Sequence, residues 1–260
     1  MIFETHAHYD DDRFIFDREQ LLGKELGAAG IGKIMNVAAD IDSVDSTNDL
    51  SLRYENVYAA LGIHPSEISG LTEDDMGHIR MLTERNNKVR AIGEIGFDYH
   101  DEDYDREEQE KWFIRQIMLA KELMLPIVVH SRGAAADTMR VIGEHYTGKE
   151  EGINGVIHCF SYSAEDAERY IALGFMIGVG GVVTFKNGKK LKDVVRRIPL
   201  TAIVLETDSP YLSPEPYRGE RNTSLNLRYV VKSIAEIKGL SEAEVEAATY
   251  ENAMRLYHLS

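Results

Sequence analysis

The chain contains a single cysteine, Cys159, among its 260 residues. A lone thiol cannot form an internal disulfide, which excludes the disulfide scaffolds of small secreted proteins and is typical of a reducing compartment. Long apolar runs are absent too, since no stretch of the sequence approaches the roughly 20 residues that a membrane-spanning helix needs. The first apolar run lacks the basic start of a secretory signal. We therefore expect a cytoplasmic protein without membrane contacts.

Positive charge is scarce in this sequence. The 29 lysines and arginines are outnumbered by 44 acidic residues, which gives a formal net charge of −15. This is the wrong sign for a protein that coats nucleic acid, because such binding depends on many cationic contacts to phosphates. It does not exclude an enzyme that holds a few phosphates in one local basic pocket.

Short apolar runs rich in β-branched residues alternate with longer segments of helical periodicity, and no Pro-, Ser- or Gly-rich linker interrupts them. Strands are predicted over Ile2–His8, KIMNVAAD, VYAALGIHP, VRAIGEIGFDY, PIVVHSR, GVIHCFS, FMIGVGG and AIVLETDSP. Helices are predicted over Arg13–Ala29, Ser43–Arg53, Glu73–Asn86, Arg106–Met124, Ala134–Tyr146, Ala164–Leu173, Lys189–Arg197, Leu225–Lys238 and Ser241–Tyr257.

This alternation predicts an α/β fold. Near-continuous apolar strands separated by helices indicate a parallel sheet that is covered on its outer face. Eight strand–helix units within residues 1–260 predict a single-domain TIM (β/α)8 barrel, whose active site lies at the carboxyl ends of the strands. An open doubly wound sheet is the alternative, but no G-x-G-x-x-G motif follows the first strand to support a dinucleotide site. The GVGG glycines, Gly178–Gly181, are instead expected to allow close backbone approach at a crowded rim.

Side chains with metal-ligating chemistry stand near the carboxyl ends of six predicted strands. Five of the nine histidines and four carboxylates occupy such positions: His6, His8, His64, Glu94, Asp98, His130, His158, Glu206 and Asp208. A single histidine at a strand end is more often a hydrogen-bonded packing residue than a ligand. Gathered at one barrel mouth without a cation, however, the carboxylates would repel and the imidazoles would compete for few partners. A divalent metal resolves both problems, so we predict a metal site.

The number of donors favours two metal ions over one. Four imidazoles and two or three carboxylates exceed the four ligands of one tetrahedral site, whereas two ions that share a carboxylate fit the set. We predict that Glu94 bridges the ions, that His6, His8 and Asp208 complete one site, and that His130 and His158 complete the other. Mixed imidazole and carboxylate ligands suit Zn, Mn or Mg, and the sequence leaves this choice open.

No cysteine or serine nucleophile competes with this interpretation. Ser131 and Ser161 fall near the predicted mouth, but no Ser-His-Asp arrangement accompanies them. Cys159 directly follows His158, so its side chain is expected to point the other way and to pack in the core.

Six motifs occur along the chain in the order ETHAHYD, GIHP, AIGEIGFDYH, VVHSR, IHCFS and LETDSPYLSPEPYRGERN. Together they resemble the successive motifs of the TatD family of metal-dependent deoxyribonucleases, over the range from His6 to Asn222. That family adopts a TIM barrel within the wider metal-dependent hydrolase superfamily. The resemblance implies cation-dependent hydrolysis of DNA phosphodiester bonds, typically by exonuclease action.

Carried over position by position, the family's metal ligands are the same six that the strand positions select: His6, His8, Glu94, His130, His158 and Asp208. The resemblance adds His64 as a residue near the substrate phosphate. It also implies that Glu206 orients a ligand, with a barrel-capping salt bridge as the alternative. The chain departs from the family pattern at Gly133, Tyr162 and Ser224, which puts substrate preference in doubt more than metal binding.

Substrate contacts are predicted in the loops after strands seven and eight, where barrels often bind phosphate. Arg218 and Arg221 are the strongest candidates because guanidinium groups bind phosphate in a bidentate manner, and Arg132 could join them. Lys186, Lys189 and Lys190 are alternatives, although lysines at a helix start are commonly only solvated. Three aromatic residues are candidates to stack a base: Tyr211, Tyr217 and Phe185. A few contacts of this kind favour DNA with a single-stranded end as substrate.

We predict catalysis by a water molecule that two metal ions activate for in-line attack on phosphorus. Asp208 accepts the proton of this water, Glu94 bridges the metals, and His64 acts on the substrate. Rival hypotheses on the same barrel are a D-aminoacyl-tRNA deacylase and a small phosphoester or amide hydrolase. Phosphotriesterase-type barrels often bridge their metals with a carboxylated lysine, whereas Glu94 stands at that position here. A non-catalytic scaffold is disfavoured because every predicted ligand is present.

Overall fold

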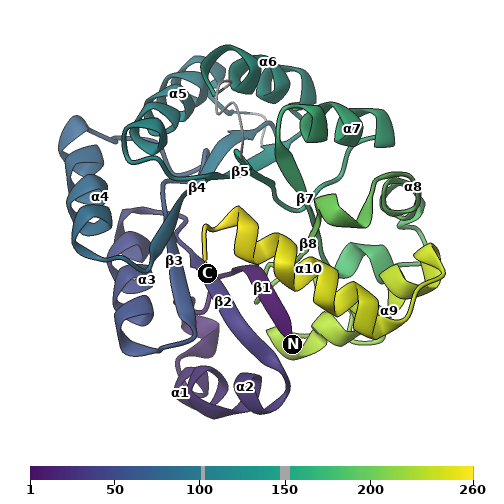
Figure 1. Ribbon diagram of the computed structural model, residues 1–260. Helices are drawn as coiled ribbons and strands as arrows, with labels where there is room; N and C mark the ends of the chain where they lie inside the picture. Colours follow the sequence, from purple (N-terminus) through teal and green to yellow (C-terminus); the bar gives the residue numbers. More distant parts are fainter. Residues whose placement is uncertain (101–102, 147–152, 260) are drawn as a thin grey trace.

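The computed structural model describes residues 1–100, 103–146 and 153–259, and it contains one eight-stranded sheet in the order β1 to β8. Each of the seven pairs of consecutive strands is parallel. The strands are β1 (Ile2–Ala7), β2 (Ile31–Val37), β3 (Val57–Leu61), β4 (Val89–Asp98), β5 (Ile127–Arg132), β6 (Gly155–Ile157), β7 (Phe175–Val179) and β8 (Ile203–Leu205). The predicted TIM barrel is therefore confirmed (Figure 1).

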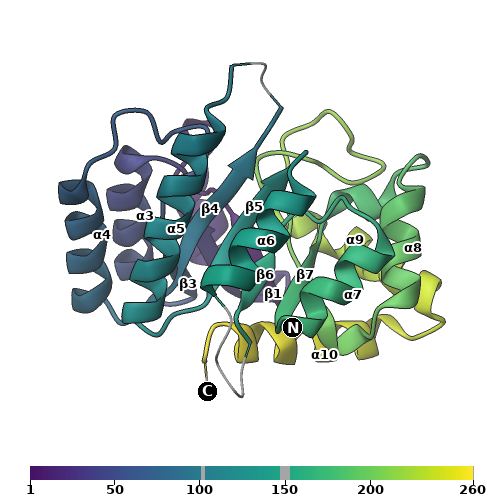
Figure 2. The same ribbon diagram turned by 90° about the horizontal axis from the view of Figure 1, so that it is seen from above.

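Helices surround the barrel and alternate with its strands (Figures 1 and 2). They are α3 (Ile41–Arg53), α4 (Glu73–Arg85), α5 (Arg106–Glu122), α6 (Ala135–His145), α7 (Ala164–Ala172), α8 (Lys189–Arg197), α9 (Leu227–Lys238) and α10 (Glu242–Leu256). Reciprocal capping boxes start α3, α4, α7 and α10, which explains why these helices begin at sharp points. None of the helices in the described ranges is both long and apolar enough to cross a bilayer.

Strands β8 and β1 approach each other beside the predicted ligands. The backbone N–H of His8 donates to the carbonyl of Ser209 at 2.8 Å, and that of Asp208 donates to the carbonyl of His6 at 3.0 Å. The hydroxyl of Thr5 also donates to the carbonyl of Leu205 at 2.9 Å. These bonds fix the backbones that carry His6, His8 and Asp208 against one another.

Helix α10 covers the amino-terminal end of the barrel (Figure 1). Its Ala253 and Leu256, with Tyr257 just beyond it, belong to the same buried apolar cluster as Phe3 and Met35 of the first two strands. The phenol of Tyr257 donates to the carbonyl of Thr5 at 2.9 Å. This end of the barrel is thus filled by side chains, as expected for a barrel whose site lies at the opposite end.

The segment predicted as one helix over Arg13–Ala29 is broken, so this prediction is wrong. The structure has 3-10 helix η1 (Asp12–Phe14), then α1 (Arg18–Gln20), the π-helical turn η2 (Leu21–Glu25) and α2 (Leu26–Ala28). The guanidinium of Arg18 donates to the carbonyls of Tyr9, Asp10 and Asp11, which holds the preceding residues as a loop. Three further short 3-10 helices are η3 (Gly181–Thr184), η4 (Leu200–Ala202) and η5 (Ser224–Asn226).

Candidate metal centre

The carboxyl ends of the strands bring the six predicted ligands together. Five of them line a cavity of about 660 Å³ at the barrel mouth: His8, Glu94, His130, His158 and Asp208. The sixth, His6, is fully buried beside them. His158 and Asp208 lie beyond β6 and β8, because these strands end earlier than the apolar runs predicted.

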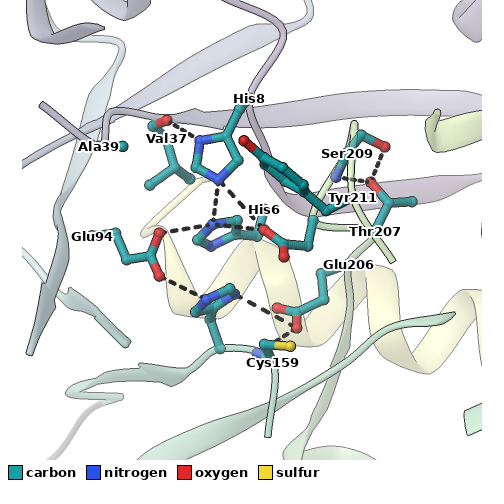
Figure 3. Close-up of polar contacts among 12 residues, drawn as sticks. His6, His8, Val37, Ala39, Glu94, Cys159, Glu206, Thr207, Ser209 and Tyr211 are labelled. Atoms are coloured by element: carbon teal, nitrogen blue, oxygen red, sulfur yellow. Dashed lines mark hydrogen bonds and ion pairs between the residues drawn. The ribbon is translucent and has the colours of Figure 1, made fainter. Parts of the chain in front are cut away.

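Glu94 lies at the centre of the group and is only 3% exposed. Its Oε1 lies 2.7 Å from His130 Nδ1 and 2.7 Å from His158 Nε2. Its Oε2 lies 3.4 Å from His6 Nε2, on the other side of the carboxylate (Figure 3). The two oxygens therefore face two different sets of imidazoles, which is the arrangement that a bridging carboxylate requires.

The second set consists of His6, His8 and Asp208. The Nε2 atoms of the two histidines lie 3.2 Å apart, and Asp208 Oδ1 lies 3.7 Å from the first and 3.4 Å from the second. The Nδ1 of His8 lies 2.7 Å from the carbonyl oxygen of Val37. This carbonyl can only accept, so Nδ1 carries a proton and Nε2 is the ring nitrogen directed at the other ligands.

Burial and neighbouring groups shift the pKa values of these carboxylates in opposite directions. Burial and the neighbouring His158 lower the pKa of His6 to about 4, so this imidazole is neutral at pH 7 and free to act as a ligand. Burial favours the neutral form of Glu94, but His158 and His6 outweigh it and hold the pKa of this carboxyl well below its usual range. Burial likewise disfavours the Asp208 carboxylate, yet its bond to His8 lowers the pKa. The centre thus combines ionised carboxylates with a neutral imidazole.

Several buried polar atoms in this region have no hydrogen-bond partner. Within the described ranges they include His6 Nδ1, His158 Nδ1 and Glu206 Oε2. Three groups of side chains have ligand atoms that lie within 4.8 Å of one another: His6 with His8 and Asp208, His64 with Glu94 and His130, and His6 with His158 and Glu206. Orphaned buried nitrogens and converging carboxylates fit divalent metal binding.

Glu206 lies behind the centre and is 1% exposed. Its Oε1 accepts the backbone N–H of Cys159 at 2.5 Å and lies 3.8 Å from His158 Nδ1. A Cβ atom at Gly178 would lie 2.3 Å from the side-chain Oε2 of Glu206. A Cβ atom at Gly181 would lie 2.2 Å from the backbone carbonyl oxygen of Leu212, which confirms the close backbone approach predicted for the GVGG glycines. Burial raises the pKa of Glu206 to about 7.

His64 lies at the edge of the ligand group, on the side that faces the cavity. Its Nε2 is 4.0 Å from Glu94 Oε1, while its Nδ1 is 2.7 Å from the hydroxyl of Ser66. Burial lowers the pKa of His64 to about 4. A neutral imidazole at this place lines the cavity and can exchange hydrogen bonds with a bound substrate.

Cys159 does not pack in the core as predicted. Its residue is half-buried, and it lines a small cavity together with Gly180 and Leu212. The expectation assumed a regular strand, but β6 ends at Ile157, and Cys159 takes a left-handed φ of 45°. Alternation of side chains no longer applies there.

One carboxylate with a structural role at the site, Glu4, was not predicted from the sequence, and a second, Asp98, was predicted at the mouth without a role. Glu4 is fully buried and accepts the backbone N–H of Thr207 at 2.9 Å and that of His6 at 3.2 Å. The signal was available, since Glu4 is an acidic residue inside an otherwise apolar strand. Asp98 was noted without a role, and its Oδ2 lies 3.0 Å from His130 Nε2.

The predicted substrate-binding arginines lie in three different environments. Arg132 is exposed and lines the mouth. Arg218 is exposed and lies over the ring of Phe185, 4.4 Å from its centroid. Arg221 forms a 2.5 Å ion pair with Asp17, so its guanidinium already has a carboxylate partner. Binding of phosphate by these residues stays a prediction.

The remaining candidates for substrate contacts lie around the same loops. Lys186, Lys189 and Lys190 are exposed at or just before the start of α8. Tyr211 lines the mouth, whereas Tyr217 packs against Tyr229 with ring centroids 5.5 Å apart.

The mouth itself is acidic. Apart from the ligands, its lining includes Asp10, Asp11, Asp12, Asp40, Glu67 and Asp98, and Arg132 is the one lysine or arginine that lines it among the residues the structure describes. A polyanionic substrate would be repelled by this surface unless cations at the centre offset its charge.

A TIM barrel whose strands end in a shared cluster of histidines and carboxylates defines a metal-dependent hydrolase. The sequence profile of the TatD related DNases matches residues 3–258. The chain therefore belongs to the TatD-related DNase family, whose members are metal-dependent enzymes that hydrolyse ester bonds.

Individual relatives agree with this assignment over their full length. The metal-dependent hydrolase YabD of Bacillus subtilis is 38% identical, and the alignment covers 100% of both chains. The 3'-5' ssDNA/RNA exonuclease TatD of Cronobacter sakazakii is 29% identical over 98% of this chain and 97% of its own. The crystal structure of YjjV, a TatD homologue from Escherichia coli K12, superposes with a TM-score of 0.93 at 31% identity, covering 100% of this chain and 98% of that one.

Proposed function

We propose that this enzyme hydrolyses phosphodiester bonds at the single-stranded ends of DNA, as an exonuclease with two divalent metal ions. The position of Glu94 carries the proposal, because its two oxygens face two separate sets of imidazoles at 2.7 and 3.4 Å. Paired metal ions that share a carboxylate are typical of enzymes that cleave phosphate esters. The name of the Cronobacter sakazakii relative, a 3'-5' ssDNA/RNA exonuclease, supports nucleic acid as the substrate class.

Six residues would hold the two ions, and Glu94 would bridge them. His6, His8 and Asp208 would complete one site, and His130 and His158 the other. When bound, such ions lower the pKa of water and stabilise negative charge on the phosphate. Zn, Mn and Mg all suit this mixture of nitrogen and oxygen ligands.

The protein's own residues would then orient the substrate and move the proton. Asp208 stays ionised at neutral pH because its bond to His8 lowers its pKa against the effect of burial, so its carboxylate can accept the proton of the attacking water. Arg132, at the edge of the mouth, would bind a non-bridging phosphate oxygen. His64 would hydrogen-bond to the phosphate or to the leaving oxygen. Arg218 and Arg221 are the further candidates for phosphate contacts outside the mouth.

A nuclease assay resolved by cation tests this proposal. Purified protein is stripped with EDTA, reloaded with Zn, Mn or Mg, and given short oligonucleotides labelled at either end. The proposal expects cleavage only after reloading, loss of cleavage in Glu94→Ala, and a stepwise ladder from one end. Absence of cleavage with each of the three cations would refute it.

The acidic lining of the mouth favours a second candidate, hydrolysis of a less anionic ester such as a D-aminoacyl group on tRNA. Asp10, Asp11, Asp12 and Asp40 would attract an ammonium group and repel phosphates. Release of a D-amino acid from charged tRNA, measured beside nucleotide release from single-stranded DNA, distinguishes the two.

A further inference from the structure

Two large apolar side chains are exposed in the loop between β1 and α1. Ile15 is 59% exposed and Phe16 is 100% exposed. Isolated apolar residues on a surface are ordinary and carry no meaning by themselves. Their surroundings decide whether this pair is incidental.

The loop is anchored on both sides of the pair. On one side Phe14 is fully buried, and on the other Asp17 forms the ion pair with Arg221. Arg221 also donates to the carbonyl of Arg13 at 2.6 Å and lies over the ring of Phe14, 4.7 Å from its centroid. One guanidinium thus ties together the residues before and after the pair, which leaves Ile15 and Phe16 outside these anchors.

The same loop is continuous with the metal centre. Asp11 and Asp12 line the mouth, and the guanidinium of the next residue, Arg13, lies 4.2 Å from the ring centroid of Tyr211. Tyr211 also lines the mouth, 48% exposed, with its ring centroid 6.4 Å from that of His8 (Figure 3). A wall of the mouth therefore continues from the ligands, through Tyr211 and Arg13, to the exposed pair.

The charge of this wall decides what it can bind. Asp10 and Asp12 repel phosphates, whereas Asp11 is paired with the guanidinium of Arg13 at 2.7 Å, so the sugar-phosphate backbone of a bound strand is disfavoured beside Asp10 and Asp12. An uncharged nucleobase meets no such repulsion, and an exposed aromatic ring provides a stacking surface for any base. A phenylalanine exposed on a loop that is anchored before and after it, beside these aspartates, suits a base and disfavours a phosphate.

We propose that Phe16, with Ile15 beside it, stacks an unpaired nucleobase of a single-stranded nucleic acid whose phosphodiester occupies the metal centre. The inference rests on the proposed function and extends it, since it assigns a base subsite outside the mouth. It also gives Arg221 a positioning role through Asp17 and the loop.

The test compares two matched substrates, a thymidine 12-mer and a 12-mer of the same backbone whose interior residues are abasic. Phe16→Ala is expected to raise KM for the thymidine strand on the order of 5- to 150-fold, the loss that removal of one stacked base produces. It is expected to leave kcat for that strand and kcat/KM for the abasic strand unchanged. Phe16→Trp, which keeps an aromatic ring at this position, should have the KM of the wild type for the thymidine strand.

Leu52→Ala is the matched control, because Leu52 is 63% exposed on α3, outside the loop and the mouth. Leu52→Ala should leave KM and kcat unchanged for both substrates. Equal KM values for Phe16→Ala and wild type on the thymidine strand would overturn the inference while leaving the proposed function intact. If the wild type cleaved neither the thymidine strand nor the abasic strand, both the inference and the proposed function would be overturned. A change in oligomeric state of Phe16→Ala in sedimentation would assign the pair to an interface between copies of the chain, and would also overturn it.

Discussion

The imidazole rings of His6 and His158 are stacked, with centroids 3.7 Å apart and planes inclined by 13°. Both rings direct Nε2 toward Glu94, at 3.4 and 2.7 Å. Among the described residues neither Nδ1 has a hydrogen-bond partner, although that of His158 lies 3.8 Å from Glu206 Oε1. Two stacked imidazolium ions would repel each other at this distance. Burial and the proximity of His158 accordingly lower the pKa of His6, so that only one ring of the pair is charged at neutral pH in the absence of a cation.

Replacement of the central carboxylate tests the bridge. Glu94→Gln preserves the size of the side chain but removes its charge and one acceptor oxygen. We expect bound metal, measured by inductively coupled plasma mass spectrometry after dialysis, to fall from about two ions per chain to one or fewer. Activity should fall by more than the 10- to 100-fold that loss of an outer hydrogen bond causes. Retention of two ions would show that Glu94 is not the bridge.

The contact between Gly178 and Glu206 gives a second prediction. Gly178→Ala introduces a Cβ 2.3 Å from Glu206 Oε2, which must displace that carboxylate. We expect metal affinity, measured by calorimetry, to weaken about 10- to 100-fold, and Glu206→Gln to behave similarly.

The double variant Gly178→Ala with Glu206→Ala provides the control for this pair. It relieves the steric conflict, so it should unfold at a higher temperature than Gly178→Ala alone, with metal affinity no better than that of Glu206→Ala. If the stability loss of the double variant equalled the sum of the losses in Gly178→Ala and Glu206→Ala, residues 178 and 206 would not interact.

Replacement of His64 should reduce turnover without reducing metal binding. It lines the mouth, and its Nε2 lies 4.0 Å from the nearest Glu94 oxygen, farther than the 2.7 Å of His130 and His158. We expect His64→Ala to lower kcat by about 10²- to 10⁴-fold with unchanged metal content, as for loss of a proton-transferring or orienting group. Release of metal without a proportionate loss of kcat in the loaded enzyme would make His64 a ligand.

The ion pair between Asp17 and Arg221 predicts a pH-dependent contribution to stability. Its hydrogen bonds to Arg221 lower the pKa of Asp17 below 3.8, so the folded state binds fewer protons than the unfolded state. The stabilisation is thus present above the unfolded pKa and is lost as the pH falls through the lower, folded value. Both side chains are over a third exposed, so Asp17→Asn should lower the melting temperature at pH 7 by no more than about 2–4 °C, and by progressively less as the pH falls below the unfolded pKa of Asp17. A difference in melting temperature that does not shrink as the pH falls would contradict the assignment.

Much of the fold follows from local patterns in the sequence. Apolar β-branched runs predict each of the eight strands, and the order of strands in a barrel places His6, Glu94 and His158 at one mouth although they are far apart in the chain. His6 and His8 stand two positions apart at the end of the first apolar run, and their Nε2 atoms lie 3.2 Å apart although β1 itself ends at Ala7. These features depend on residues close in sequence or on the topology of the barrel.

The rest depends on contacts between residues that are distant in sequence. Asp17 and Arg221 are 204 positions apart, so nothing local predicts that they pair. The break in the first predicted helix has the same origin, because Arg18 binds backbone carbonyls of the preceding loop and not the next helical turn. The early end of β6 likewise removed the basis for placing Cys159 in the core.

Anomalous-diffraction crystallography of the protein loaded with Mn or Zn tests the central claim most directly. We predict two peaks in the barrel mouth, about 3.5–4 Å apart, with a Glu94 oxygen on each ion. The first ion should contact His6 and His8. The second ion should contact His130 and His158. A single peak, or ions bound away from Glu94, would contradict it.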